Sequence, residues 1–161
     1  MSEIKWLYSA FSELTTAALY DILSLRQLVF IVEQKCPYLD ADGYDFAAKH
    51  LMGWHIHRLV AYARILPSGA KHHERSIGRV ATHPTVRGGG IGKALMQAAI
   101  RKLLAEDSVA PIRISAQEHL ADTFYAALGF QRIGHAYDED GILHVDMMHC
   151  GPLSRDRQKP P

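Results

Sequence analysis

Four glycines fall within five residues near the middle of this chain of 161 residues. The segment Arg87-Gly88-Gly89-Gly90-Ile91-Gly92-Lys93 lies between a strand-like run at residues 76–82 and a helical run that continues to about residue 106. Glycines make a helix start entropically costly, so they indicate backbone with positive φ or a closely approaching ligand. The free N–H groups and positive dipole at a helix N-terminus suit a phosphate. The sequence predicts a strand–turn–helix anion site, with a turn that binds no ligand as the alternative.

Two well-known phosphate-binding motifs do not fit this turn. A P-loop reads G-x-x-x-x-G-K-[ST], but Arg87 stands at its first glycine and Ala94 at the position of its Ser or Thr. A dinucleotide fingerprint reads G-x-G-x-x-G, and from Gly88 its third glycine falls on Lys93. These two nucleotide-binding classes are therefore disfavoured.

The spacing of apolar residues predicts the remaining elements. A helix capped by Ser12 or Thr15 carries a periodic apolar face and ends before Pro37; the residues of that face are Leu14, Ala18, Ile22, Leu25, Val29 and Val32. A short helix at residues 120–128 ends at Gly129. Strands are expected at residues 4–9, 50–56, 59–66, 76–82, 112–116, 131–137 and 142–149, the last two joined by a tight turn at residues 139–141. This order predicts an α/β domain with a mixed sheet, antiparallel in its middle and with parallel neighbours beside the central helix.

Composition bounds the domain organisation and the possible partners. Hydrophobic residues make up 48% of the chain, which is enough for one core. We expect one domain over residues 1–150 and a flexible polar tail over residues 151–161. Eighteen Lys and Arg against 17 Asp and Glu give no charge signature of a nucleic-acid or membrane partner.

The cysteines and the N-terminus predict the compartment. Cys36 and Cys150 are too few for a disulfide scaffold and favour free thiols, with one bridge between them as the alternative. No signal peptide is visible, and the longest apolar run, residues 28–32, is far shorter than the ~18 residues of a membrane span. The expected location is the cytoplasm.

Two signatures resemble those of the GCN5-related N-acetyltransferases, the GNAT superfamily. Arg87, Gly90 and Gly92 form its R-x-x-G-x-G acetyl-CoA signature, and residues 121–130 (ADTFYAALGF) resemble its second signature. Residues 26–38 and 137–142 resemble the ElaA-type branch. The resemblance implies a mixed central sheet of about seven strands flanked by about four helices. It also implies that two parallel strands splay apart to form the acetyl-CoA cleft.

The resemblance also implies how acetyl-CoA, the co-substrate, would bind. The backbone of Val80, Ala81 and Thr82 would pair with the pantetheine arm, and a backbone N–H near Ala81 or Thr82 would face the oxyanion. The pyrophosphate would lie against Arg87, Gly88, Gly89, Gly90, Ile91, Gly92 and Lys93. Many members carry an Asn where this chain has Glu118, so Gln117 is the candidate for that amide contact.

Two residues are candidates for the catalytic roles. By resemblance, Tyr125 protonates the leaving thiolate, and a plain core role is the alternative. Glu33 is the candidate base that deprotonates the acceptor amine, and a salt bridge or cap with Arg26 or Lys35 is its alternative. His83 is a second candidate base because of its intrinsic pKa, and a water chain is a further route.

No metal site is predicted. The pairs His55-x-His57 and His72-His73 lack a Cys or carboxylate at zinc spacing. The segment with Asp40, Asp42, Gly43 and Asp45 departs from the calcium-loop pattern. By resemblance, this segment and His50 border the acceptor site.

These observations favour one function and leave two alternatives. The chain is interpreted as an N-acetyltransferase in which a primary amine attacks acetyl-CoA directly in a ternary complex. The alternatives are a non-catalytic acyl-CoA-binding or regulatory module on the same fold, and a phosphate-binding protein outside the superfamily. The acceptor stays open among polyamines, amino acids, antibiotic-like amines and peptide lysines, and a homodimer is compatible with the sequence.

Overall fold

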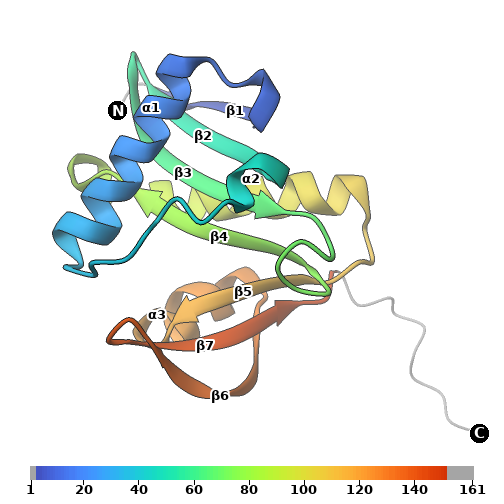
Figure 1. Ribbon diagram of the computed structural model, residues 1–161. Coiled ribbons are helices and arrows are strands. Elements are labelled where there is room, and N and C mark those ends of the chain that lie inside the picture. Colours follow the sequence, from blue (N-terminus) through green and yellow to red (C-terminus); the bar gives the residue numbers. More distant parts are fainter. Residues whose placement is uncertain (1–2, 152–161) are drawn as a thin grey trace, which may run out of the picture.

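The computed structural model describes residues 3–151 (Figure 1). The strands are β1 (Lys5–Ala10), β2 (Lys49–His55), β3 (Arg58–Leu66), β4 (Arg75–Thr82), β5 (Ile112–Gln117), β6 (Gln131–Glu139) and β7 (Ile142–His149). The α-helices are α1 (Thr16–Arg26), α2 (Ile91–Glu106) and α3 (Glu118–Leu120). The π-helical turns are η2 (Gln27–Glu33) and η5 (Ala121–Tyr125), and the 3₁₀ turns are η1 (Phe11–Glu13), η3 (Tyr44–Ala47), η4 (Pro84–Val86) and η6 (Ala126–Leu128). All seven expected strands are present, whereas residues 152–161 of the expected tail lie outside the described residues.

The strands form one mixed sheet in the order β1-β2-β3-β4-β5-β7-β6. Among the described strands only β4 and β5 run parallel, and α2 connects them as predicted. The parallel pair lies inside the sheet with antiparallel strands on both sides, so the expectation of an antiparallel middle is wrong. Three α-helices are found where about four were expected, because α1 and α3 continue as π and 3₁₀ turns instead of starting new helices.

Two apolar clusters fix these layers. The larger one joins α2 and η5 to β3, β4, β5 and β7, and includes Leu95, Ile114 and Val145. The smaller one lies on the other face of the sheet, where α1 and η2 pack on β2, β3 and β4. Figure 1 shows α1 on one side of the N-terminal strands and α2 on the other. The sheet is therefore the middle layer of three.

The first helix departs from ideal α geometry at its C-terminal end. Thr15 caps it by accepting a hydrogen bond from the Ala18 N–H at 3.1 Å, which decides between the two predicted caps. From Gln27 on, the chain continues as the π-helical turn η2. A π turn has more residues per turn than an α-helix, so the apolar periodicity loses its phase there. Val32, expected on the buried face, is therefore 66% exposed.

The feature that shapes the site is the divergence of β4 from β5. The two strands pair only at Arg75 with Ile112 and at Ser76 with Arg113. Beyond these pairs, β4 carries a bulge opposite β3, and Arg79 in the bulge has a positive φ of 52°. A bulge bends its strand and increases the local twist. The edge of β4 that faces β5 is thus open toward Thr82.

Candidate active site

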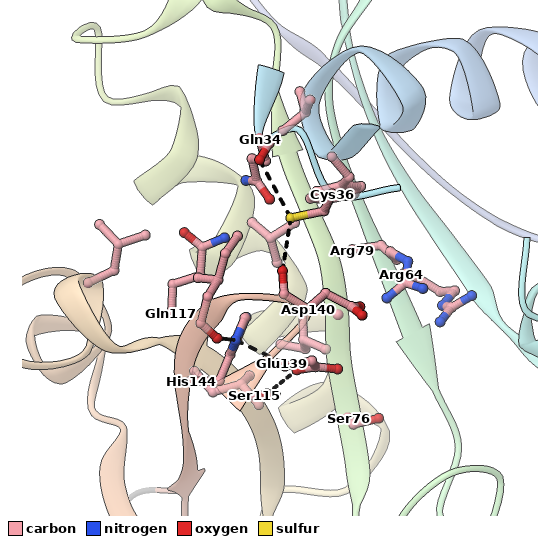
Figure 2. A pocket seen from close by; sticks show the side chains of 18 of the residues that line it. Gln34, Cys36, Arg64, Ser76, Arg79, Ser115, Gln117, Glu139, Asp140 and His144 are labelled. Atoms are coloured by element: carbon pink, nitrogen blue, oxygen red, sulfur yellow. Dashed lines mark hydrogen bonds and ion pairs between the residues drawn. The ribbon is translucent and has the colours of Figure 1, made fainter. Parts of the chain in front are cut away.

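A cavity of about 510 Å³ lies between the splayed strands. Its walls are η2 and residues 34–42 on one side, β4 at the back, and β5 with the β6–β7 hairpin on the other side. Figure 2 shows Arg64 and Arg79 on one wall and Ser115, Gln117, Glu139 and His144 on the other. Tyr125 lines the cavity from beneath β5 and β7. The cavity therefore lies where the resemblance expects an acyl donor and an acceptor to meet.

The expected pantetheine contacts divide between backbone and side chains. Val80, Thr82 and Gln117 line the cavity. Ala81 is 2% exposed and packs in the cluster under α1, so only its backbone is available to a ligand at the strand edge. An open strand edge can bind an extended ligand through main-chain hydrogen bonds. Gln117 ends β5 directly across the cleft from this edge.

The glycine-rich turn forms the N-terminus of α2. Gly88 and Gly90 both have a φ of 79°, and Gly90 is the N-cap of the helix. An added Cβ at either position would meet nothing within 4 Å, so backbone conformation and not crowding requires glycine there. The first helical bond is donated by Ala94 to the Gly90 carbonyl, which leaves the preceding N–H groups of the helix for an anion. The turn is exposed and continues directly from Arg87 at the mouth of the cavity.

Arg87 connects the turn to the strand and to the first helix. Its guanidinium donates to the Thr82 carbonyl at 2.9 and 3.2 Å and to Glu33 Oε1 at 2.6 Å. Both side chains are about two-fifths exposed, at 41% and 37%. Glu33 lines the cavity and is in an ion pair, but its partner is neither Arg26 nor Lys35, the two partners considered from the sequence. Arg87 and Glu33 are 54 positions apart in the sequence, so only the tertiary structure brings them together.

Tyr125 is a buried residue that also lines the cavity. Its side chain packs edge-on against Phe124 and Phe130 at centroid distances of 5.0 and 6.2 Å. Burial raises the pKa of Tyr125 to about 12, because the phenolate is poorly solvated there. The hydroxyl therefore stays protonated throughout the neutral range.

His83 lies away from the cavity. Arg58 donates to its Nε2 at 2.7 Å, and its Nδ1 lies 2.8 Å from the Thr85 hydroxyl. Burial, and then the charge of Arg58, lower the pKa of His83. Since His83 caps η4 and is absent from the cavity wall, the geometry does not support its candidacy as the base.

An ionic network that the sequence reading did not anticipate supports the wall near β4. Arg26 is fully buried and donates to Asp40 at 2.7 Å and to Asp45 at 2.6 Å. Arg79 donates to Asp40 at 2.6 Å, so Asp40 ties α1 to the strained bulge. Arg64 binds Asp42 with both terminal nitrogens, at 2.6 and 2.7 Å. The Asp40–Asp45 segment is thus an arginine-binding loop, and Asp42 alone of its acidic residues lines the cavity.

His50 belongs to this network and not to the cavity wall, where the resemblance expected it. It is fully buried, the Tyr62 hydroxyl lies 2.8 Å from Nδ1, and the Asp45 carbonyl lies 3.0 Å from Nε2. The carbonyl can only accept, so Nε2 carries the proton and Nδ1 accepts from Tyr62. Burial lowers the pKa of His50, and the ring is neutral.

The C-terminal strands contribute a polar face that the sequence reading also missed. On β5 and β7 the residues Ile114, Ala116, Val145 and Met147 are buried, so the alternate residues lie on the opposite face, where Ser115, Gln117 and His144 line the cavity. Those alternate residues are Arg113, Ser115, Gln117, His144 and Asp146. The pattern was visible within each strand, but only the insertion of β7 between β5 and β6 places these side chains together.

Three further findings concern metals, thiols and membranes. Within residues 3–151, no group of three or more His, Cys, Asp or Glu side chains is placed to hold a metal ion. Cys36 is buried and Cys150 is exposed, and both are free thiols rather than a bridge. None of the helices in the described part of the chain is long and apolar enough to cross a bilayer.

Comparison with known proteins identifies relatives across nearly the whole chain. The model of the acetyltransferase (GNAT) domain matches residues 45–149. A UPF0039 protein of Synechocystis is 44% identical over 151 residues, which cover 93% of this chain and 97% of that protein. Protein ElaA of Escherichia coli is 40% identical over 146 residues, covering 89% of this chain and 95% of ElaA.

Solved structures agree with these matches. The crystal structure of Escherichia coli ElaA gives a TM-score of 0.86 at 39% identity, covering 91% of this chain and 99% of that chain. The structure of an acyl-CoA N-acyltransferase from Pseudomonas aeruginosa gives the same TM-score and the same coverage at 36% identity. The glycine-rich turn and the splayed strands lie within residues 45–149, whereas the cavity wall formed by residues 29–42 precedes that range. The chain therefore belongs to the GNAT acetyltransferase family and, within it, to the group that contains ElaA.

Proposed function

We propose that the protein transfers the acetyl group of acetyl-CoA to a primary amine, on a small molecule or a peptide, by direct attack in a ternary complex. The observation that carries the proposal is the divergence of β4 from β5 after two paired residues, beside a glycine-capped helix start. The open edge suits the amide-bearing arm of CoA, and the helix start suits its pyrophosphate.

In this mechanism, the residues on β4 and in the turn bind and orient the donor. Backbone groups of Val80 and Thr82 hold the extended arm, and the N–H groups from Gly88 to Lys93 hold the phosphates. A backbone N–H near Ala81 or Thr82 stabilises the oxyanion that forms on the thioester carbonyl. Holding both substrates in one cavity supplies a further part of the rate.

Two proton transfers remain for side chains. Tyr125, whose hydroxyl is protonated at neutral pH, gives its proton to the leaving thiolate. Glu33 is a candidate for the base that deprotonates the amine. Arg87 binds Oε1 of this carboxylate at 2.6 Å, so the amine would approach the second oxygen, Oε2.

Calorimetric titration of the ligand-free protein with acetyl-CoA tests the proposal, with ATP and NAD as controls. We expect binding of acetyl-CoA alone, followed by amine-dependent consumption of the thioester with a panel containing a polyamine, an amino acid, an aminoglycoside and a lysine peptide. Binding without turnover across the panel would favour the non-catalytic module. Absence of acetyl-CoA binding would overturn both the acetyltransferase and the non-catalytic acyl-CoA-binding module.

The proposed cellular location follows from the same chemistry. Acetyl-CoA and two free thiols, one of them exposed, fit a reducing cytoplasm. The catalytic unit is proposed to comprise residues 1–150, with acetyl-CoA and the amine as its substrates and no metal taking part.

A further inference from the structure

The β6–β7 hairpin places an imidazole on the cavity wall. His144 lies on β7, paired with Gln117 of β5 on one side and with Tyr137 of β6 on the other. Its neighbour Val145 is buried in the core on the opposite face. His144 therefore faces the cleft, and it lines the same cavity as Val80 and Tyr125.

The hydrogen bonding of His144 leaves one ring nitrogen able to accept a proton. Nδ1 lies 2.8 Å from the Ile142 carbonyl oxygen, which can only accept a hydrogen bond. Nδ1 therefore carries the proton of the neutral ring, and the lone pair is on Nε2. Within residues 3–151, Nε2 has no hydrogen-bond partner. A neutral imidazole of this tautomer is a ready base.

A carboxylate lies beside the same ring. Glu139 Oε2 is 3.8 Å from His144 Nδ1, and the Ser115 hydroxyl donates to this carboxylate oxygen at 3.4 Å. Figure 2 shows the three side chains together on the wall formed by the C-terminal strands. A nearby negative charge favours the imidazolium that forms when the ring takes up a proton. Glu139 thus suits a positioning residue.

The other charged groups around His144 do not cancel the effect of Glu139 on its imidazole ring. The Tyr137 ring stacks on the imidazole at 6.2 Å, and its hydroxyl donates to Asp146 at 3.0 Å. On the opposite wall, the positive charges of Arg64 and Arg79 are bound to acidic residues of the 40–45 segment. Lys71 and His72 line the same cavity from the loop after β3. By contrast, Glu33 forms its ion pair with Arg87, 2.6 Å away.

On the basis of the acetyl transfer proposed above, we propose that His144 removes the proton from the acceptor ammonium through Nε2, and that Glu139 stabilises the resulting imidazolium. The free amine then attacks the thioester carbonyl, forming the C–N bond while the C–S bond breaks. The nitrogen loses two protons in all. His144 passes one to solvent, and the second replaces the proton that Tyr125 gives to the CoA sulfur.

Two amines that differ in protonation test this assignment. Methylamine is almost wholly protonated at pH 7 and needs a base, whereas hydroxylamine is largely neutral and does not. Transfer is followed by the loss of thioester absorbance with each amine in excess, after subtracting the rate without enzyme. A thiol reagent is avoided because Cys150 is exposed.

We expect His144→Gln to lower kcat/KM for methylamine by about 100-fold or more. The same variant should leave the hydroxylamine rate and acetyl-CoA binding close to wild type. Glu139→Gln should also lower kcat/KM for methylamine and leave the hydroxylamine rate close to wild type, because the imidazolium loses its neighbouring negative charge. His135→Gln is the matched control, since His135 is exposed on the same hairpin and does not line the cavity.

The contrary outcomes are distinct. Equal losses with both amines in His144→Gln would show a structural role and overturn the assignment. An unchanged methylamine rate would also overturn it, and a selective loss in Glu33→Gln would then assign the base to Glu33. Failure of the wild-type protein to acetylate both of these amines and every amine of the panel, while it binds acetyl-CoA, would contradict the proposed function itself, and the role of His144 with it.

Discussion

At the scale of single residues, Tyr125 is the proposed donor of the proton to the leaving thiolate. Tyr125→Phe removes only the hydroxyl, so we expect turnover to fall by about 100-fold while the Kd for acetyl-CoA stays the same. The measurement is steady-state turnover with the best amine of the panel, beside calorimetry. Tyr20→Phe is the control, because Tyr20 is 75% exposed. Unchanged turnover in Tyr125→Phe would remove the general-acid role.

Asp40 is the residue on which the buried ionic network depends most. Asp40→Asn leaves the fully buried Arg26 and the bulge residue Arg79 each with one carboxylate fewer. Breaking a buried ion pair costs about 3–5 kcal/mol, so urea denaturation should show a large loss in the free energy of unfolding. Asp122→Asn provides the comparison, because Asp122 pairs with Arg132 while 73% exposed. Similar small losses in both variants would show that the network adds little stability.

At the scale of elements, the turn before α2 is the most sharply testable unit. Gly90→Asp forces an L-residue into a φ of 79° and puts a negative charge where the phosphates are proposed to bind. We expect acetyl-CoA affinity to fall by at least about tenfold, which corresponds to about 1.4 kcal/mol. Gly69→Asp is the matched control, because Gly69 has a φ of 80° and open space around it but lies in another loop. Equal acetyl-CoA affinity in the two variants would exclude the turn as the phosphate site.

The elements also show what the sequence could and could not predict. Period-two and period-four apolar patterns predicted all seven strands and the strand–turn–helix unit, because burial of one face is a local property of the sequence. The phase shift at η2 was missed, since a π turn has no signature in apolar spacing. The position of His144 at the cleft depends on which strands become neighbours, and the pairing of Arg87 with Glu33 depends on where η2 packs against the sheet. Such contacts arise only from the tertiary arrangement.

At the scale of the whole molecule, stability should decline on the acid side in two stages. Burial holds the pKa of His50 below its unfolded value of about 6.5, so folding is favoured by its neutral form. Stability from this group is fully present above about pH 6.5 and is lost as the pH falls toward the depressed folded pKa. Below about pH 4, Asp42 adds a second loss. Burial alone would raise the pKa of Asp42, but hydrogen bonds and charges from Arg64 and Arg79 lower it to about 2.

Urea unfolding measured from pH 8 to pH 3 checks this profile. The slope of the unfolding free energy between pH 6.5 and 5 should decrease in His50→Gln, by at most about 1.4 kcal/mol per pH unit for one proton. The slope below pH 4 should remain in that variant, because it belongs to the carboxylates. An identical slope in His50→Gln and wild type above pH 5 would show that His50 is not the group responsible.

Only two residue pairs join β4 to β5, so the sheet is open between these two strands beyond those pairs. The backbone amides along the free edge of β4 have no strand partner on that side, so they should exchange with solvent deuterium faster than those of β2 or β3. Acetyl-CoA bound along that edge would pair with the backbone of β4. It would slow the amide exchange of residues 80–82 without altering the fold. Amide exchange would then register occupancy of the cleft before any acceptor is known.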